Sequence, residues 1–162
     1  MKRIYLAGPE VFRLDAPQEG MRLKALCRAH GLVGHFPLDD TESGGPAIIY
    51  QSCLAGVIAC DAVVANISPF RGPHMDPGTA FEIGYAVAIR KPVFGWSTRT
   101  DELHRRIPHR QRSEDDLRID EGRHIVEDMG LAENLMIAAG LASLHSSPEA
   151  AIAAAARALL RR

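Results

Sequence analysis

The sequence predicts an α/β fold built on a parallel sheet. Short apolar runs typical of strands alternate with segments of helical periodicity as far as residue 96. One run, Ala62 to Ala65, is apolar throughout, as in a strand that is buried on both faces. Strands that alternate with helices are joined by right-handed crossovers, and such crossovers make the strands parallel. The chain of 162 residues contains no internal repeat, so we expect a single domain over residues 1–162.

The pattern places five strands and five helices along the chain. We expect strands at residues 4–7, 32–36, 61–66, 93–96 and 141–144. We expect helices at residues 17–30, 47–59 and 78–90, a short one beginning at 132, and a last one over 147–160. Residues 41–46 are polar and glycine-rich and predict a loop. Residues 98–123 are crowded with charge and predict a long surface excursion, either flexible or settled by a partner subunit.

Composition excludes several classes of protein. A formal net charge of -1 gives no general attraction to nucleic acid or to an anionic membrane. No apolar run approaches the ~20 residues of a membrane span, and the N-terminus does not resemble a signal peptide. Three cysteines without a CxxC pair indicate reduced thiols and a cytoplasmic protein, with Cys53 and Cys60 on one buried helix face. The seven histidines lack metal-ligand spacing, so we expect no metal or cofactor.

The stretch from Asp61 to Ala86 predicts the functional site. A buried strand leads into a loop, and Asp76 followed by Pro77 marks the start of a helix. Glu82 lies in that helix between Phe and Ile, where burial is costly unless the carboxylate is hydrogen-bonded or used in chemistry. The carboxyl end of a strand is where open α/β sheets bind ligands. We therefore interpret Glu82 as the reacting group, with the helix start favouring its ionised form.

Glu82 and Asp76 together are suited to chemistry at an anomeric carbon. Two carboxyl groups about 5 to 10 Å apart can act as a nucleophile and as an acid that assists the leaving group. In the alternative interpretation, Asp76 only caps the helix and Glu82 pairs with an arginine such as Arg71. His74 is near Asp76 in the sequence, where it either tunes that carboxyl or is simply exposed.

Other side chains are expected to reach the same crevice. Tyr5 lies in the first strand, and its hydroxyl could hold Glu82, although a core tyrosine is the alternative. Asp39 and Asp40 follow the second strand and either reach the crevice or are turn residues. Phe70 could stack on a planar ring, or pack within its own loop.

Five segments carry motifs that match one family of enzymes: Tyr5–Phe12, Asp61–Asn66, Ser68–Gly72, Asp76–Ala86 and Asn134–Met136. From Ile4 to about Met136 the chain resembles the nucleoside 2-deoxyribosyltransferases. The resemblance implies a flavodoxin-like, three-layer α/β/α fold with a five-stranded parallel sheet, assembled as dimers or hexamers. It also implies transfer of 2-deoxyribose between purine or pyrimidine bases in nucleoside salvage, with a deoxynucleoside and a free base as substrates and no cofactor.

The resemblance assigns roles to individual residues. Glu82 resembles the nucleophile that forms a deoxyribosyl-enzyme intermediate, and Tyr5 resembles the tyrosine that orients it. Asp76 resembles the aspartate that binds the sugar hydroxyl, and Asn134 the asparagine that a neighbouring subunit lends. The full set of expected substrate-binding residues is Gly8, Phe12, Asp39, Asp40, Phe70, Arg71, Gly78, Asn134 and Met136.

The chain departs from the family in two places. Cys53 stands where some members have an aspartate that protonates the base, and a thiol with an unperturbed pKa of about 8.5 is a poor donor. Either Asp39, Asp40 or Asp76 then protonates the base, or the base preference is narrowed. Some members end in a tyrosine whose terminal carboxylate enters the site, whereas this sequence ends in two arginines, so we expect its last helix to serve packing.

Two other functions remain open from the sequence. The first is hydrolysis of the N-glycosidic bond of a nucleoside or deoxynucleoside 5'-monophosphate. Glu10 in the first loop would repel the phosphate, unless the basic run Arg105–Arg112 folds over the site rather than forming a solvated face. The second is a catalytically inactive nucleotide-binding domain, against which the presence of both Glu82 and Asp76 argues.

Overall fold

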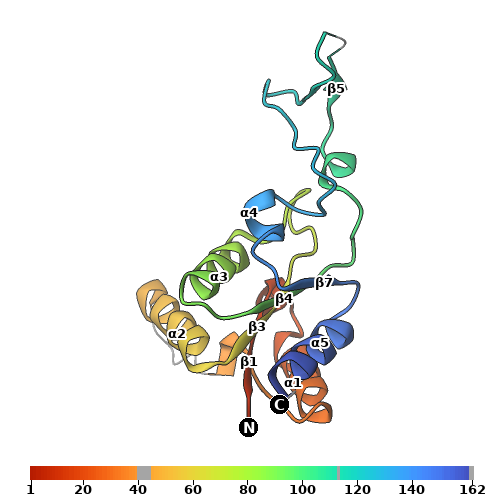
Figure 1. The fold of residues 1–162 in the computed structure, drawn as a ribbon. Coiled ribbons are helices and arrows are strands. Elements are labelled where there is room, and N and C mark those ends of the chain that lie inside the picture. The colour runs from red at the N-terminus through yellow and green to blue at the C-terminus, as the bar shows by residue number, and fades with distance from the viewer. Residues whose placement is uncertain (40–44, 113, 161–162) are drawn as a thin grey trace.

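The computed structural model describes residues 1–39, 45–112 and 114–160. Five parallel strands form the central sheet, in the order β2-β1-β3-β4-β7 (Figure 1). This is the strand order of flavodoxin-like folds, so the predicted fold class is confirmed. The strands are β1 (Arg3–Ala7), β2 (Val33–His35), β3 (Ala62–Asn66), β4 (Val93–Trp96) and β7 (Ser143–His145).

Helices cover both faces of the sheet and make three layers (Figure 1). One face carries α1 (Ala16–Ala29) and α5 (Pro148–Leu160), which contact each other. The other face carries α2 (Pro46–Ala59) and α3 (Pro77–Ala88), which also contact each other. Within the described ranges, no helix combines the length and the apolar character needed to cross a bilayer.

Alternation along β1 decides which layer each side chain enters. Ile4 and Leu6 belong to the core formed with α1 and α5, whereas Tyr5 and Ala7 belong to the core formed with α2 and α3. Successive residues of a strand point to opposite faces, so Tyr5 must face the layer that contains α3. Gly56 of α2 permits this packing, because a Cβ there would lie 2.8 Å from Cε2 of the Tyr5 ring.

Most predicted elements lie within a residue or two of their observed bounds. One differs in kind, one strand is shifted along the chain, and the short helix expected from residue 132 begins at Leu135. Residues of the expected loop after β1 form a 3-10 helix, η1 (Pro9–Phe12). The predicted strand at 141–144 begins only at Ser143, because Leu141 still belongs to the turn that ends α4 (Leu135–Ala138). Of the predicted loop over 41–46, residues 41–44 lie outside the described residues, and Pro46 is the first residue of α2.

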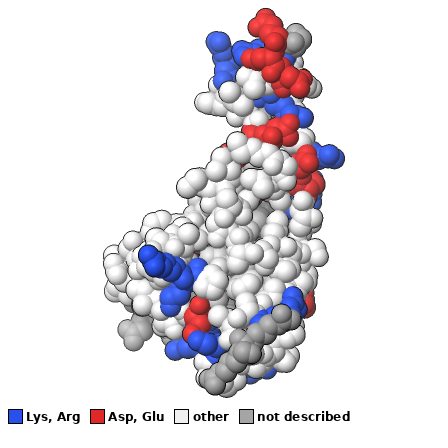
Figure 2. Space-filling model, viewed as in Figure 1, with Lys and Arg blue, Asp and Glu red and all other residues white. Residues whose placement is uncertain are grey.

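Residues 98–131 form a projecting segment that leaves the sheet after β4 and returns before α4 (Figure 1). It contains η3 (Leu103–Arg106) and an antiparallel pair, β5 (Arg110–Gln111) and β6 (Arg118–Ile119). Among its described residues, the buried ones are Leu103 and Val126. Figure 2 shows many charged side chains of both signs on this part of the molecule. The expectation of a surface excursion with little core of its own is therefore confirmed.

Candidate active site

A pocket of about 510 Å³ opens beside the carboxyl end of β1, between η1, α2 and the start of α3. Most of its lining is apolar: Val11, Phe12, Pro37, Leu38, Ile49, Tyr50, Leu54 and Phe81. Gly8 and Gly78 also line it, together with four polar or ionisable side chains: Cys53, Asp76, Thr79 and Glu82. An apolar cavity with a few convergent polar groups is the usual form of a small-molecule site. The predicted pair Asp76 and Glu82 therefore lies in one pocket.

The start of α3 fixes the position of both carboxyl groups. Asp76 is the N-cap residue, and its Oδ2 accepts hydrogen bonds from Thr79 N at 2.8 Å and from Thr79 Oγ1 at 2.9 Å. Pro77 occupies the first helical position, where its missing N–H costs nothing. Asp76 thus caps the helix and lines the pocket at the same time. Glu82 follows in the second turn and faces β1.

Tyr5 binds Glu82 directly across the layer. Tyr5 Oη donates a hydrogen bond of 2.6 Å to Glu82 Oε1, although the two residues are 77 positions apart in the sequence. The alternative in which Glu82 pairs with Arg71 is wrong for this structure. The guanidinium of Arg71 instead lies over two aromatic rings, 4.6 Å from the centroid of Phe70 and 5.3 Å from that of Phe12.

Burial dominates the electrostatics of this pair. Burial raises the pKa of Glu82 to about 7, the hydrogen bond from Tyr5 lowers it, and the negative charge of Asp76 raises it. Burial thus acts against the expectation that the helix start favours the ionised form of Glu82. Burial and then the charge of Glu82 raise the pKa of Tyr5, so its hydroxyl stays protonated and remains a donor.

At the edge of the pocket Phe12 contacts a second aromatic ring and a cation. The rings of Phe12 and Phe70 stack with centroids 5.5 Å apart and an interplanar angle of 15°. Phe12 is half exposed and lines the pocket, whereas Phe70 and Arg71, which were also expected to bind substrate, are not among its lining residues. Arg71 adopts a left-handed backbone conformation with φ 53°, which is uncommon for a residue other than glycine.

The buried carboxyl of Glu10, which was expected to face a bound phosphate, instead holds the loop after β1. Glu10 is buried and accepts a hydrogen bond of 2.5 Å from Asn66 Nδ2, while Asn66 Oδ1 accepts one from Ser68 N. A Cβ on Gly8 would lie 2.0 Å from Glu10 Oε2, so only glycine allows this arrangement. Glu10 does not line the pocket, and the expectation that it would repel a bound phosphate is therefore unsupported.

Asp39, which was expected after β2 to reach the crevice, does not line the pocket. Asp39 Oδ1 pairs with Lys24 Nζ at 2.5 Å, and Asp39 Oδ2 accepts a hydrogen bond from Phe36 N. These contacts make Asp39 a turn residue, which was the alternative interpretation. Asp40 lies outside the described residues.

Asn134 and Met136 also lie outside the pocket of their own chain. Asn134 caps α4 through a hydrogen bond from Met136 N to its Oδ1 and donates to Glu127. Met136 is 76% exposed. His74, which was expected either to tune Asp76 or to be exposed, is exposed and binds Glu133 Oε1 at 2.8 Å.

Cys53 is not the core residue that its spacing from Cys60 indicated. It lies on α2, is partly exposed and lines the pocket, and burial raises the pKa of its thiol. Cys60 is buried, but it follows the end of α2 at Ala59, so helical periodicity does not relate the two residues. The thiol of Cys53 stays protonated at neutral pH and is a weak acid in the pocket.

One group in the described residues offers ligand atoms for a metal ion, and the sequence analysis missed it. Glu102, His104 and Asp128 place three such atoms within 4.8 Å of one another in the projecting segment. None of the three lines the pocket at α3. Their separation in the sequence left no motif to find.

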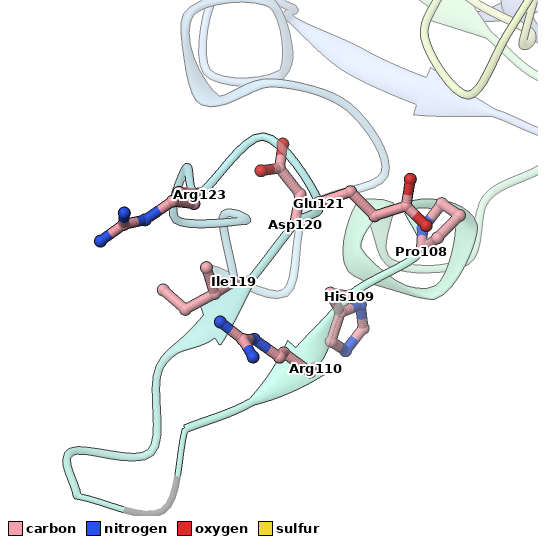
Figure 3. A pocket seen from close by; sticks show the side chains of 7 residues that line it. All are labelled: Pro108, His109, Arg110, Ile119, Asp120, Glu121 and Arg123. Carbon is pink, nitrogen blue, oxygen red and sulfur yellow. The ribbon is translucent and has the colours of Figure 1, made fainter.

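A second cavity lies in the projecting segment and differs in kind from the first. Figure 3 shows its lining side chains, which come from β5, β6 and the adjoining turns. They are Pro108, His109, Arg110, Ile119, Asp120, Glu121 and Arg123. Four of these seven side chains are charged and five of the seven residues are exposed, and the cavity does not border the ends of the central strands. We therefore take the pocket at α3 as the candidate active site.

The fold and this pocket define an α/β protein with paired carboxyl groups at the carboxyl edge of a flavodoxin-like sheet. The chain belongs to the nucleoside 2-deoxyribosyltransferase family, whose model matches residues 4–136. Membership supports an enzyme of the deoxyribosyltransferase or N-glycosidase kind.

Three relatives illustrate this membership. A structure of a 2-desoxiribosyltransferase from Leishmania mexicana is 33% identical, with a TM-score of 0.77 over 97% of this chain and 98% of that chain. A 2-deoxyribosyltransferase from Bacillus psychrosaccharolyticus is 20% identical, with a TM-score of 0.57 over 91% of this chain and 88% of that one, and shows likeness of fold. An uncharacterized protein of Schizosaccharomyces pombe is 36% identical over 104 residues, which are 59% of this chain and 49% of that protein. The match thus spans about half the length of the Schizosaccharomyces pombe protein.

Proposed function

We propose that this protein transfers 2-deoxyribose from one nucleobase to another through a covalent deoxyribosyl-Glu82 intermediate, in nucleoside salvage. The observation that carries the proposal is the 2.6 Å hydrogen bond from Tyr5 Oη to Glu82 Oε1 at the wall of an apolar pocket. A single donor that holds one carboxylate oxygen orients the group without neutralising it. This is the arrangement that a nucleophilic carboxylate needs.

The first half-reaction forms the intermediate. Ionised Glu82 attacks C1' of a bound deoxynucleoside, and a C1'–O bond forms as the C1'–N bond breaks. The electron pair of the broken bond leaves with the base, which takes up a proton from an acid in the pocket. Asp76 and Cys53 both line the pocket, and the aspartate is the better acid. We therefore assign the protonating role to Asp76, which must take up a proton from solvent before it can donate one, in addition to binding the sugar hydroxyl.

The second half-reaction reverses the first with a different base. A ring nitrogen of the incoming base attacks C1', the C1'–O bond to Glu82 breaks, and the base gives up its N–H proton to Asp76, which the first half-reaction left ionised. The carboxylate is regenerated. The apolar side chains of η1 and α2 form a surface suited to a planar base, and Phe12 at the rim can stack on it. Because the wall recognises flat apolar surface, it fits both the departing and the incoming base.

Residues outside the pocket complete the site in an oligomer. Asn134 and Met136 do not line their own pocket, and Met136 is exposed on α4. We propose that these residues serve the pocket of a neighbouring subunit in a homodimer or a higher homo-oligomer. Mixing Glu82→Ala with Asn134→Ala protein tests the sharing, because one subunit then supplies Glu82 and the other Asn134. Recovery of activity on mixing supports a shared site, and no recovery refutes it.

The rival function, hydrolysis of a nucleoside 5'-monophosphate, fits the pocket less well. The charged side chains among its described lining residues are the two carboxylates Asp76 and Glu82. A phosphate would need cationic or N–H donors, and Arg71 faces Phe12 and Phe70 instead. Arg106 of the basic run is likewise engaged elsewhere, with Pro73 O and Asp101 O.

Product analysis tests the proposal. The protein is incubated with one deoxynucleoside and a different free base, and the mixture is separated by chromatography. We expect the swapped nucleoside to appear only when the second base is present. A parallel incubation uses the deoxynucleoside 5'-monophosphate. Release of base from the monophosphate alone, with no swapped product, would refute the transferase.

Covalent trapping tests the nucleophile and excludes an inactive domain. A 2-fluoro-2-deoxy nucleoside should leave the mass of one sugar on the peptide that contains Glu82. The Glu149→Gln variant is a matched control, because Glu149 lies on α5 far along the chain and pairs with Arg22 at the surface. This control should be labelled like the wild type. Label on another peptide would reassign the nucleophile, and no label with any nucleoside would favour the inactive domain.

A further inference from the structure

The carboxylate of Glu133 is buried next to the segment that leads into the pocket. Its residue is 1% exposed, and the sequence analysis gave it no role. Glu133 Oε1 accepts from Asn134 N at 3.0 Å and lies 2.8 Å from His74 Nδ1. Glu133 Oε2 accepts from Met75 N at 3.0 Å. One carboxylate therefore binds two backbone segments that are about 59 residues apart in the sequence.

Arg106 supplies the opposite charge that such a buried carboxylate needs. Its side chain is 5% exposed, and its Nη2 lies 3.7 Å from Glu133 Oε2. Arg106 also donates to three backbone carbonyls, those of Pro73, Asp101 and Ala132. A buried ion pair is stable only when its remaining hydrogen-bonding groups are satisfied. Two of these partners, Pro73 and Ala132, lie on the same two segments that Glu133 binds. Glu133 and Arg106 together hold the segment around Met75 against the segment around Asn134.

The two segments end at residues with proposed roles. Met75 is bonded to Glu133 and immediately precedes Asp76, the pocket carboxyl at the start of α3. Glu133 immediately precedes Asn134, the cap of α4 and the residue proposed to serve a neighbouring pocket. We infer that Glu133, held by Arg106, is a positioning residue that sets Asp76 for its own pocket and Asn134 for a neighbour's. The inference rests on the proposed function.

The geometry separates this role from direct catalysis. Neither Glu133 nor Arg106 lines the pocket, so neither touches a bound base or sugar there. Their loss should displace Asp76 while leaving the apolar wall formed by η1 and α2 in place. Misplacement of a catalytic group by about 1 Å can cost on the order of 100-fold in rate. We therefore expect a change in kcat with little change in the KM for the free base.

The test uses Glu133→Gln and Arg106→Lys, with Arg105→Lys as the matched control. Arg105 is the neighbouring arginine, but its side chain is 64% exposed and its contact with Glu102 is 3.6 Å long. The rate of each variant is divided by the number of sites that the 2-fluoro sugar labels, so that unfolded protein does not enter the comparison. We expect kcat per labelled site to fall about 10- to 100-fold in both buried variants, with KM for the base within about twofold of wild type. Arg105→Lys should match the wild type.

His74 provides a milder variant in case the buried substitutions prevent folding. Its side chain is 52% exposed, so its replacement leaves the core intact. We expect His74→Ala to lower kcat by a few-fold, and His74→Asn, whose amide can donate to Glu133, to restore part of the loss. Equal rates for His74→Ala and wild type, together with a wild-type rate per site in any folded Glu133 or Arg106 variant, would overturn the inference.

Hydrogen exchange gives a readout that does not depend on turnover. In Glu133→Gln, backbone amides of the peptide around Met75 and of the peptide around Asn134 should both exchange faster than in Arg105→Lys. Faster exchange in only one peptide would show that Glu133 does not join the two segments. If wild-type protein swaps no bases, the proposed function fails. Hydrogen exchange then still decides whether Glu133 joins the segments around Met75 and Asn134. If wild-type protein swaps bases and the variants match it, the positioning role alone fails.

Discussion

The carboxyl group of Glu82 in the pocket and two carboxyl groups in the projecting segment have pKa values shifted in opposite directions. In the pocket, burial raises the pKa of Glu82 to about 7. In the projecting segment, the hydrogen-bonded Arg99 lowers the pKa of Asp101 to about 2, and Arg112 lowers the pKa of Asp115 in the same way. The contrast shows that the sheet layers supply desolvation, whereas the projecting segment supplies ion pairs in water.

This contrast separates the two regions by what they can do. A carboxyl with a strongly shifted pKa in a pocket is typical of a functional site, and Glu82 is still partly ionised near neutral pH, as a nucleophile must be. Asp101 and Asp115 remain charged at any neutral pH and can only attract cations. Ion pairs exposed to water contribute little to stability and weaken in salt. We therefore expect substitutions in the pocket to change activity strongly and substitutions of exposed ion pairs to change little.

The largest effect is expected for Glu82→Gln. The amide keeps the size of the side chain and can still accept from Tyr5, but it cannot attack C1'. Base exchange should fall on the order of 1000-fold or more, as for loss of other nucleophiles. The measurement is initial rate by chromatography, with circular dichroism to confirm folding. A folded variant that retains wild-type exchange would show that Glu82 is not the nucleophile.

The next largest effect is expected for Tyr5→Phe. This change removes the 2.6 Å hydrogen bond to Glu82 and leaves the ring in the core. We expect kcat to fall about 10- to 100-fold, since the carboxylate loses its orienting donor. The same hydrogen bond lowers the pKa of Glu82, so the acid limb of the pH–rate profile should move to higher pH. An unchanged acid limb would mean that Tyr5 serves packing alone.

A smaller effect is expected from pH on the wild-type protein. Because Glu82 must be ionised to attack, activity should be about half maximal near pH 7 and should fall further as pH drops. The folded pKa lies above the ordinary 4.5, so the folded state holds a proton that the unfolded state releases between those values. Stability from Glu82 is thus complete below pH 4.5 and is lost as pH rises through 7.

Glu82→Gln tests the sign of this linkage. The variant should gain stability relative to wild type as pH is raised from 4.5 to above 7, measured by denaturant unfolding at each pH. Glu149→Gln, an exposed acid outside the pocket, should show no such gain. A constant difference between Glu82→Gln and wild type across the range would show that burial does not raise this pKa.

The smallest effect is expected for Arg112→Ala in the projecting segment. Arg112 pairs with Asp115, and their side chains are 50% and 38% exposed. The free energy of unfolding should stay within the error of the measurement, and base exchange should be unaffected. Denaturant unfolding at low and high salt measures the free energy of unfolding. A larger loss would show that this end of the molecule is structurally coupled to the sheet.

Sequence patterns predicted those parts of the site that depend on neighbours along the chain. Asp76, Pro77 and Glu82 lie in one strand-loop-helix unit. Local rules therefore predicted the N-cap at Asp76, the start of the helix at Pro77 and the helix face that carries Glu82. The contact of Tyr5 with Glu82 was also predictable, because β1 lies beside β3 in a sheet of this order. The apolar wall from α2 was not predicted, since that helix is apolar on most sides and its periodicity does not show which side faces a pocket.

The sequence by itself determined the α/β class, the parallel sheet and the position of the candidate carboxyl groups, because hydrophobic periodicity and helix caps are local. Tertiary structure alone decided that Asp39 turns to Lys24, that Cys53 faces the pocket, and that Glu133 meets Arg106. It also decided that Glu82 titrates near neutrality. Desolvation and ion pairing sum over atoms that are close in space and distant in sequence, so no pattern along the chain carries them.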